Sequence, residues 1–245
     1  MEIDDWIDWS AAGAKPLPGE ALRTLRYMQD IESHTIVYLR SLLGTRAVDD
    51  PAIAEFLARW FHEETLHGQA LARLLALHGA PVLPRPRSAP GLRERVHAAG
   101  AALLSRVWPE FPVVHMLWGA INELTTLTGY RRLAQLAGHP ALGALLDRIV
   151  RDESRHFGFY YDEARRRLAE PAVGRRARAL VERLWAPVGS GVQPDAEVRF
   201  VAGYLFSGDE GLAAARRVDA TIRRLPGLAE LPLLEAWLSA ARVRA

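Results

Sequence analysis

A glutamate and a histidine three residues apart occur twice in this sequence. The first pair, Glu64 and His67, lies in the stretch HEETLHG, and the second, Glu153 and His156, lies in RDESRH. Residues at this spacing on a helix share one face, so each pair would present a carboxylate beside an imidazole. The face of the first pair is otherwise apolar, so the pair is predicted to point into a core. The apolar residues on that face are Leu57, Trp60, Phe61, Leu71 and Leu74.

A lone glutamate precedes each pair. Glu32 lies 32 residues before Glu64, and Glu123 lies 30 residues before Glu153. Each has apolar neighbours at helical spacing and is therefore predicted to face the core. The two halves form an internal repeat of a helical hairpin. The neighbours are Met28, Ile36, Leu39 and Leu43 for the first glutamate, and Met116, Ala120, Leu127 and Tyr130 for the second.

Four carboxylates buried together need compensating positive charge, because each loses its hydration and repels the others. Two divalent metal ions would neutralise all four. A bundle with one Glu from each of two helices and Glu-x-x-His from each of the other two is the arrangement of di-iron carboxylate proteins. The mixed oxygen and nitrogen donors suit iron or manganese. The alternative is a polar core network without metal. The predicted ligands are Glu32, Glu64, His67, Glu123, Glu153 and His156.

Three neighbouring residues are candidates for supporting roles. Glu63 and Asp152 each precede a predicted ligand, and each would either orient a histidine across the bundle or remain a solvated helix charge. Thr126 lies one turn after Glu123, where its hydroxyl would either deliver a proton to the site or bond back to the carbonyl of Asn122.

The elements that must position these residues are helices, because long stretches follow the 3.6-residue period and none alternates with period two. Four long helices are predicted over 19–43, 51–78, 113–136 and 140–168, with a shorter one over 92–107 and an extended connector at 81–91. Three or four further helices are expected after residue 171, separated by APVGSGVQPD, SGDEG and LPGLAELP. We predict an all-α fold with one domain over 1–245, consisting of a core bundle over about 19–168 and accessory helices over about 171–245.

Composition excludes several kinds of site. The 245 residues include no cysteine, which rules out disulfides, thiolate catalysis, iron–sulfur clusters and Cys-ligated zinc. The net charge of +2 does not indicate a nucleic-acid-binding protein. The acidic start MEIDDWIDWS lacks signal-peptide features, and no run of eighteen apolar residues occurs. We therefore expect a cytoplasmic protein without a membrane partner.

The sequence resembles the ferritin-like di-iron superfamily over about Leu22–Leu168, and within it the soluble acyl-carrier-protein desaturases most closely. HEETLHG looks like that family's first Glu-x-x-His followed by Gly, RDESRH looks like its Asp-Glu-x-x-His, and Glu123-Leu124-Thr125-Thr126 is similar to its Glu-x-x-Thr. The resemblance implies a ferritin-like four-helix bundle. It also implies that the six predicted ligands hold two iron ions, with Glu64 and Glu153 as bridging carboxylates.

By the same resemblance the protein would use dioxygen to desaturate or hydroxylate an aliphatic acyl substrate, carried in related enzymes by a carrier protein. Electrons would come from a ferredoxin or a similar donor, and the protein would form a homodimer. A manganese–iron pair is an alternative to two irons. The chain is shorter than most plant-type members and shows no distinct carrier-docking segment. Candidates for the substrate channel wall are Trp60, Phe61, Met116, Leu127, Phe157 and Tyr160.

Related activities remain as alternatives. Arylamine N-oxygenases usually add a seventh ligand, a His four residues before the second motif's Glu, where this chain has Ile149. Aldehyde-deformylating oxygenases have a similar length and ligand spacing but less similar local motifs. Rubrerythrins would bring a cysteine-ligated iron domain, which this chain lacks. Ferritin-like iron storage is the non-catalytic alternative.

Overall fold

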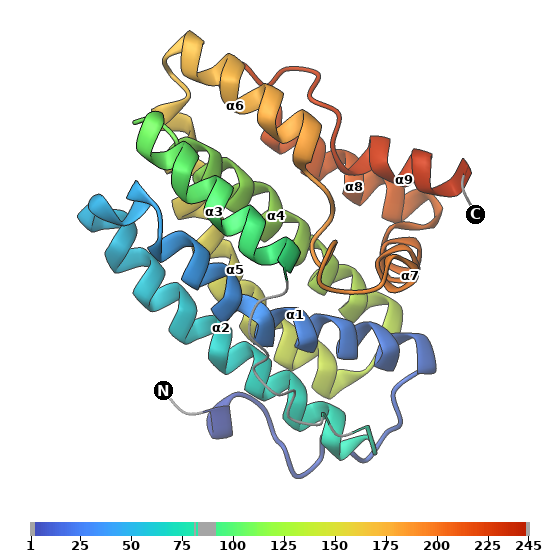
Figure 1. Ribbon diagram of the computed structural model, residues 1–245. Coiled ribbons are helices and arrows are strands. Elements are labelled where there is room, and N and C mark those ends of the chain that lie inside the picture. Colours follow the sequence, from blue (N-terminus) through green and yellow to red (C-terminus); the bar gives the residue numbers. More distant parts are fainter. Residues whose placement is uncertain (1–2, 81, 83–91, 244–245) are drawn as a thin grey trace.

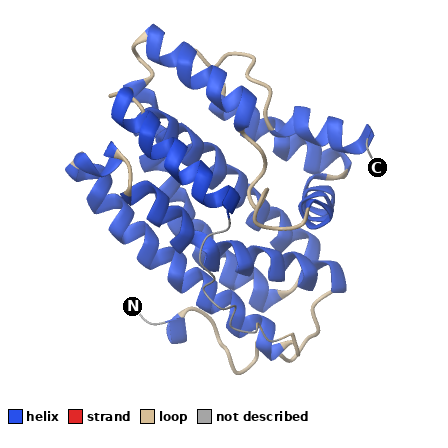
Figure 2. Cartoon of the chain, viewed as in Figure 1, coloured by secondary structure: helices blue, strands red, loops and turns tan. Residues whose placement is uncertain are grey.

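All the regular secondary structure in the described part of the protein is helical. The computed structural model describes residues 3–80, 82 and 92–243, and these contain helices, turns and loops but no strand (Figure 2). This confirms the predicted all-α class. The connector predicted at 81–91 lies outside the described residues apart from Val82.

Four long helices form the bundle: α1 (Gly19–Leu43), α2 (Pro51–Leu77), α4 (Pro112–Ala137) and α5 (Pro140–Arg167). The pairs α1–α2 and α4–α5 make the most extensive contacts, and α2 with α5 and α1 with α4 join the two pairs (Figure 1). Each hairpin thus corresponds to one half of the sequence repeat. The shorter α3 (Leu92–Val107) connects the hairpins and contacts α1.

Local signals fix where these helices begin. Pro51, Pro112 and Pro140 each stand in the first helical turn, where a missing backbone N–H leaves no donor unpaired. The side chain of Asp50 accepts a hydrogen bond from the N–H of Ala52 at the start of α2. Helix α4 ends at a glycine in the left-handed region, as a backbone turn between antiparallel helices requires. These starts set which residues of each hairpin meet at mid-bundle.

The bundle core consists of two apolar clusters with a polar layer between them. One cluster contains Met28, Leu71, Leu127 and Ile149, and the other contains Leu39, Leu57, Met116 and Tyr160. On each long helix, the residue from one cluster and the residue from the other lie on either side of a predicted metal ligand. The ligands therefore occupy a layer sealed by apolar packing at both ends.

The C-terminal helices are α6 (Pro171–Leu184), α7 (Asp195–Phe206), α8 (Gly208–Ile222) and α9 (Leu234–Val243). Helices α6, α7 and α8 pack on α4, on the side of the bundle away from the N-terminal segment (Figure 1). The loop predicted at SGDEG is shorter than expected, because only Ser207 lies between α7 and α8. Gly208, with φ of +66°, turns the chain in one step, and Asp209 and Glu210 then favour the first turn of α8.

None of the described helices combines the length and hydropathy that crossing a membrane requires.

Candidate metal centre

Six side chains from the four long helices converge in the polar layer. Glu32 comes from α1, Glu123 from α4, and the two Glu-x-x-His pairs come from α2 and α5. All six are buried, and none exposes more than 7% of its surface. They are the residues that the sequence repeat brings together, and the bundle places them at one level.

Their donor atoms form two overlapping groups of four, each with all its atoms within 4.8 Å of one another. Glu64 and Glu153 belong to both groups. His67 Nδ1 lies 3.4 Å from a Glu153 oxygen, and His156 Nδ1 lies 3.3 Å from a Glu64 oxygen. The groups are Glu32, Glu64, His67 and Glu153, and Glu64, Glu123, Glu153 and His156. Two cations held in this way would share two carboxylates.

Each histidine is oriented from the opposite helix. Nε2 of His67 on α2 lies 3.3 Å from Asp152 on α5, and Nε2 of His156 on α5 lies 2.7 Å from Glu63 on α2. Because an ionised carboxylate only accepts, the Nε2–H of each ring donates to it. The other nitrogen, Nδ1, then faces the cluster with its lone pair available to a metal.

A single guanidinium joins the two orienting carboxylates. Nη2 of Arg155 donates to Glu63 at 2.9 Å and to Asp152 at 2.5 Å, and Arg148 contacts Asp152 at 2.5 Å. These cations and the histidines outweigh the effect of burial and lower the pKa of Asp152 and of Glu63. Both carboxylates are therefore ionised at neutral pH and able to accept from the imidazoles.

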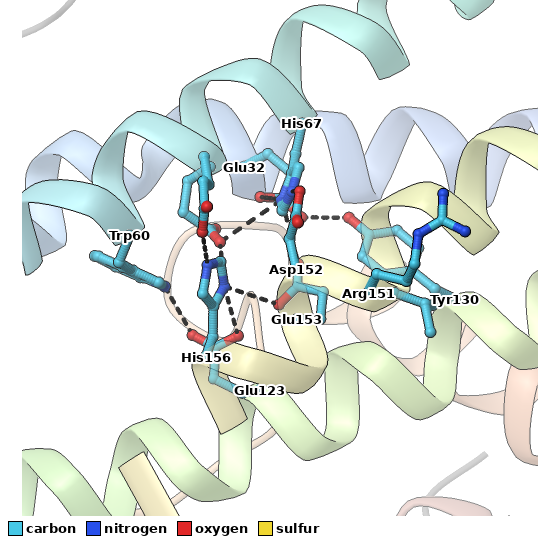
Figure 3. Close-up of polar contacts among 12 residues, drawn as sticks. Glu32, Trp60, His67, Glu123, Tyr130, Arg151, Asp152, Glu153 and His156 are labelled. Carbon is cyan, nitrogen blue, oxygen red and sulfur yellow. Dashed lines mark hydrogen bonds and ion pairs between the residues drawn. The ribbon is translucent and has the colours of Figure 1, made fainter. Parts of the chain in front are cut away.

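Glu32 and Glu123 each belong to only one of the two groups, and we call them the outer glutamates. Each accepts a hydrogen bond from an aromatic side chain. The indole Nε1–H of Trp60 donates to Oε1 of Glu123 at 2.9 Å, and the hydroxyl of Tyr130 donates to Oε1 of Glu32. Figure 3 shows both aromatic side chains outside the cluster, each pointing at one carboxylate. In each case the second oxygen, Oε2, lies 3.9 Å from the Nδ1 of a cluster histidine.

The atoms that face the centre of the cluster have no hydrogen-bond partner among the described residues. Oε2 of Glu32, Oε1 of Glu64, both oxygens of Glu153 and the Nδ1 atoms of both histidines are buried without a hydrogen bond. Buried polar atoms in folded proteins are nearly always satisfied, so six unsatisfied atoms at one place require an explanation. Cations at the centre would supply it, and the oxygen and nitrogen donors fit iron or manganese.

The charge balance leads to the same conclusion. Burial, together with the neighbouring carboxylates, raises the pKa of Glu32, Glu64 and Glu123 above the usual range. Burial opposes charge on His67, but its carboxylate neighbours outweigh it and raise its pKa to about 9. Burial and mutual repulsion thus favour the protonated form of these three carboxylates in the protein alone. Divalent ions would replace those protons.

A cavity of about 1250 Å³ reaches the cluster from the side of α1 and α4. Glu32, Glu64, Glu123 and Glu153 line it, whereas the two histidines do not. Apolar and aromatic side chains from α1, α3, α4, α6 and α9 form most of its wall. The carboxylate side of the cluster is thus the side open to a ligand.

A loop between α6 and α7 borders this cavity. Residues 186–192 line it, and Tyr27 donates a hydrogen bond of 2.5 Å to the carbonyl of Val188. Gln193 adds a hydrogen bond of 3.2 Å to Asp30. Gly189 has φ of +90°, and a side chain there would meet the Tyr27 hydroxyl. The loop is therefore fixed to α1 by specific contacts.

A second, apolar cavity of about 60 Å³ lies next to the first, beside Tyr130. Glu32 and Thr126 line both cavities. Among the described residues the Thr126 hydroxyl makes no hydrogen bond to the carbonyl of Asn122, whereas Thr125 and Thr128 do bond back to their own helix. Thr126 is thus the threonine of this stretch whose hydroxyl is free to meet a ligand.

Two of the six candidates for a channel wall lie at the large cavity. Trp60 and Tyr160 line the large cavity. The other four candidates, Met116, Leu127, Phe61 and Phe157, line neither of the two cavities, and Met116 and Leu127 pack in the apolar clusters. A helical period shows that a residue faces inward but not whether its neighbour is another side chain or an open space.

Sequence reasoning also missed contacts. Arg155 follows Asp152 by three residues, and this helical spacing was a signal for their pairing. In the sequence, Tyr130 is only one of the residues that share a face with Glu123, two turns before it, whereas in the structure its hydroxyl donates to Glu32 across the bundle. Ile149, at the position of a seventh ligand in N-oxygenases, is fully buried among apolar residues.

Comparison with known proteins identifies the family. Residues 33–180 match the family model described as fatty acid desaturase, which covers more than half of the chain. No curated protein and no solved structure matches significantly. The matched segment contains five of the six converging residues and extends through most of α6, and Glu32 precedes its first residue directly. The chain belongs to the fatty acid desaturase family.

Proposed function

We propose that the protein is a di-iron oxidoreductase that uses dioxygen to desaturate or hydroxylate an aliphatic acyl chain. The observation that carries this proposal is the pair of four-donor groups sharing Glu64 and Glu153, with their carboxylate side open to a large cavity. Family membership supports the desaturase type of chemistry. Two irons, when bound, would supply the electrons and the site for reducing dioxygen.

Both reactions balance with an external reductant. Desaturation removes two hydrogens from neighbouring carbons; with two further electrons and two protons, dioxygen becomes two waters. Hydroxylation replaces one C–H by C–OH and forms one water from the same electrons and protons. The chain has no cysteine for a redox centre of its own, so a separate donor such as a ferredoxin is proposed.

The residues around the cluster have different proposed roles. The four glutamates and two histidines would hold the metals, while Glu63 and Asp152 keep both imidazoles in the orientation that presents Nδ1. Thr126 lines both cavities, as Glu32 does, and its hydroxyl would hold a proton available to a molecule bound there. The apolar clusters exclude water from either end of the polar layer.

The cavity suits a long apolar chain with a polar end. Its volume of about 1250 Å³ exceeds the roughly 300–1,000 Å³ typical of small-ligand pockets. Arg183 and Arg199, both exposed, border it and would meet an anionic group, whether a carboxylate or the phosphate of a carrier-bound thioester. A carrier-bound acyl substrate and a homodimer are carried over from the family resemblance, and a cytoplasmic location from the acidic stretch MEIDDWIDWS and the lack of a long apolar run.

The test starts with metal content. Protein produced with iron is analysed for metal, reduced without oxygen, and then mixed with oxygen, an acyl substrate and a ferredoxin with its reductase. We expect about two irons per chain and an oxidised acyl product by mass spectrometry. A chain that binds no metal after reconstitution would refute the proposal. Uptake of many irons per chain without substrate oxidation would instead indicate storage.

A further inference from the structure

The outer glutamates differ from the shared ones in how they are held. Oε1 of Glu123 accepts the indole N–H of Trp60 at 2.9 Å, while its Oε2 is the atom nearer His156. The Trp60 side chain is buried, with only 5% of the residue exposed, so this bond is made in surroundings of low polarity, where it is stronger than in water. One oxygen of Glu123 is thereby directed away from the cluster.

Glu32 is held in the same way from another helix. Its Oε1 accepts the hydroxyl of Tyr130, which is fully buried, and its Oε2 is buried without a partner. Trp60 lies on α2 and Tyr130 on α4. Two positions that are unrelated in the sequence thus each donate a hydrogen bond to one oxygen of an outer glutamate. The internal repeat does not explain it, since the two donors are not equivalent in the two hairpins.

This arrangement limits how many donors the protein offers each metal. A carboxylate can bind a cation through one oxygen or both, and using both fills a coordination position. Because Oε1 of each outer glutamate accepts a hydrogen bond from an aromatic side chain, that glutamate would offer its metal only Oε2. Trp60 borders the large cavity and Tyr130 the small one, so each of these two bonds is made at the edge of a cavity.

We propose that Trp60 and Tyr130 are positioning residues that hold Glu123 and Glu32 to coordination through one oxygen, keeping a position on each metal open toward the cavities. The inference rests on the proposed metal centre. It predicts that a small anion binds the loaded protein directly at the metals. It also predicts that removing either donor frees a carboxylate oxygen to compete for that position.

The test uses cobalt and azide, so that it does not depend on turnover. Wild type, Trp60→Phe and Tyr130→Phe are loaded with Co²⁺, the bound cobalt is counted, and azide is titrated while the visible cobalt absorption is followed. Trp118→Phe and Tyr160→Phe are the matched controls. Both residues border the large cavity, and among the described residues neither donates a hydrogen bond to the cluster.

We expect two cobalt ions per chain in all five proteins, and azide affinity about tenfold or more weaker in the two test variants, as loss of a hydrogen bond to a charged group predicts. Unchanged azide affinity in both variants would overturn the inference. Loss of an ion from either variant would also overturn it, because the bond would then serve to retain the metal. Tyr130→Phe removes a single oxygen and keeps the test valid if Trp60→Phe unfolds. A wild type without cobalt would refute the proposed metal centre itself.

Discussion

Glu63 on α2 lies 2.7 Å from Nε2 of His156 on α5 and joins the two hairpins of the bundle. The pairing of Asp152 with His67 runs in the opposite direction, so each hairpin orients the histidine of the other. Arg155 contacts both carboxylates and links the two pairs into one network. The proposed metal centre would therefore depend on how the hairpins dock, as well as on the six converging side chains.

Replacing Glu63 with Ala should weaken metal binding by about 10- to 100-fold, because a ligating histidine loses the partner that fixes its orientation. Competition with a chelator of known affinity measures this loss. Glu55→Ala, at an exposed position of the same helix, is the control and should bind as the wild type does. Equal affinity of all three proteins would show that the His156 ring is oriented by packing alone.

Glu153 and Glu123 should differ in how much metal their loss removes. Glu153 belongs to both donor groups and Glu123 to one, so Glu153→Ala should lose both ions and Glu123→Ala mainly one. Both variants should lose substrate oxidation and keep their helical circular dichroism. Metal analysis after gel filtration gives the counts. Retained turnover with full metal loading in either variant would remove that residue from the mechanism.

The sequence predicted the bundle and the cluster because both follow from local periodicity. A repeat of Glu and Glu-x-x-His on apolar stripes determines which faces meet, and Pro and Gly at the helix ends determine the levels at which they meet. The cavity did not follow from periodicity. Its wall depends on the loop 186–192 and on α9, which are distant in sequence and carry no pattern that relates them to α1 or α4.

The bonds from Trp60 and Tyr130 were hidden for a different reason. Both residues look like ordinary core aromatics in the sequence, and both do pack in the apolar clusters. Their polar atoms meet carboxylates on other helices, and that depends on the rotation of each helix about its axis. Side-chain contacts across a bundle need the packed structure, whereas the faces do not.

Thr126→Val should reduce the amount of product formed per dioxygen consumed. Thr126 lines both cavities, as Glu32 does, and valine keeps the shape while removing the proton donor. Oxygen uptake and product are measured together to give the coupling ratio. Thr128→Val is the control, because the Thr128 hydroxyl bonds the carbonyl of Leu124 within its own helix. Unchanged coupling in Thr126→Val would assign the residue to structure.

Gly189→Ala should displace the loop that borders the large cavity. The residue has φ of +90°, and a methyl group there would lie 1.9 Å from the Tyr27 hydroxyl, breaking its bond to Val188. We expect a loss of about 1–3 kcal/mol in the free energy of unfolding and a raised KM for the substrate. Gly203→Ala, in α7 with open space around it, should instead stabilise by about 0.4–1 kcal/mol. Denaturant unfolding of both variants gives the comparison, and equal stability would show that the loop adapts.

His115 should make the protein less stable in mild acid. Burial lowers its pKa to about 4, against an ordinary value near 6.5 in the unfolded chain. The unfolded chain therefore binds a proton between these two pH values that the folded chain does not, so stability falls as the pH drops from about 6.5 to 4. The pKa shift corresponds to a loss of about 3 kcal/mol in the free energy of unfolding over this pH range. We expect the measured loss to be smaller, because the ring borders the cavity. His115→Leu should flatten this part of the stability profile, while His62→Leu, at an exposed position, should leave it unchanged. Unfolding by urea at pH 4.5 and 7 measures the slope for each protein. The same slope in His115→Leu and the wild type would mean that His115 is hydrated in the folded state.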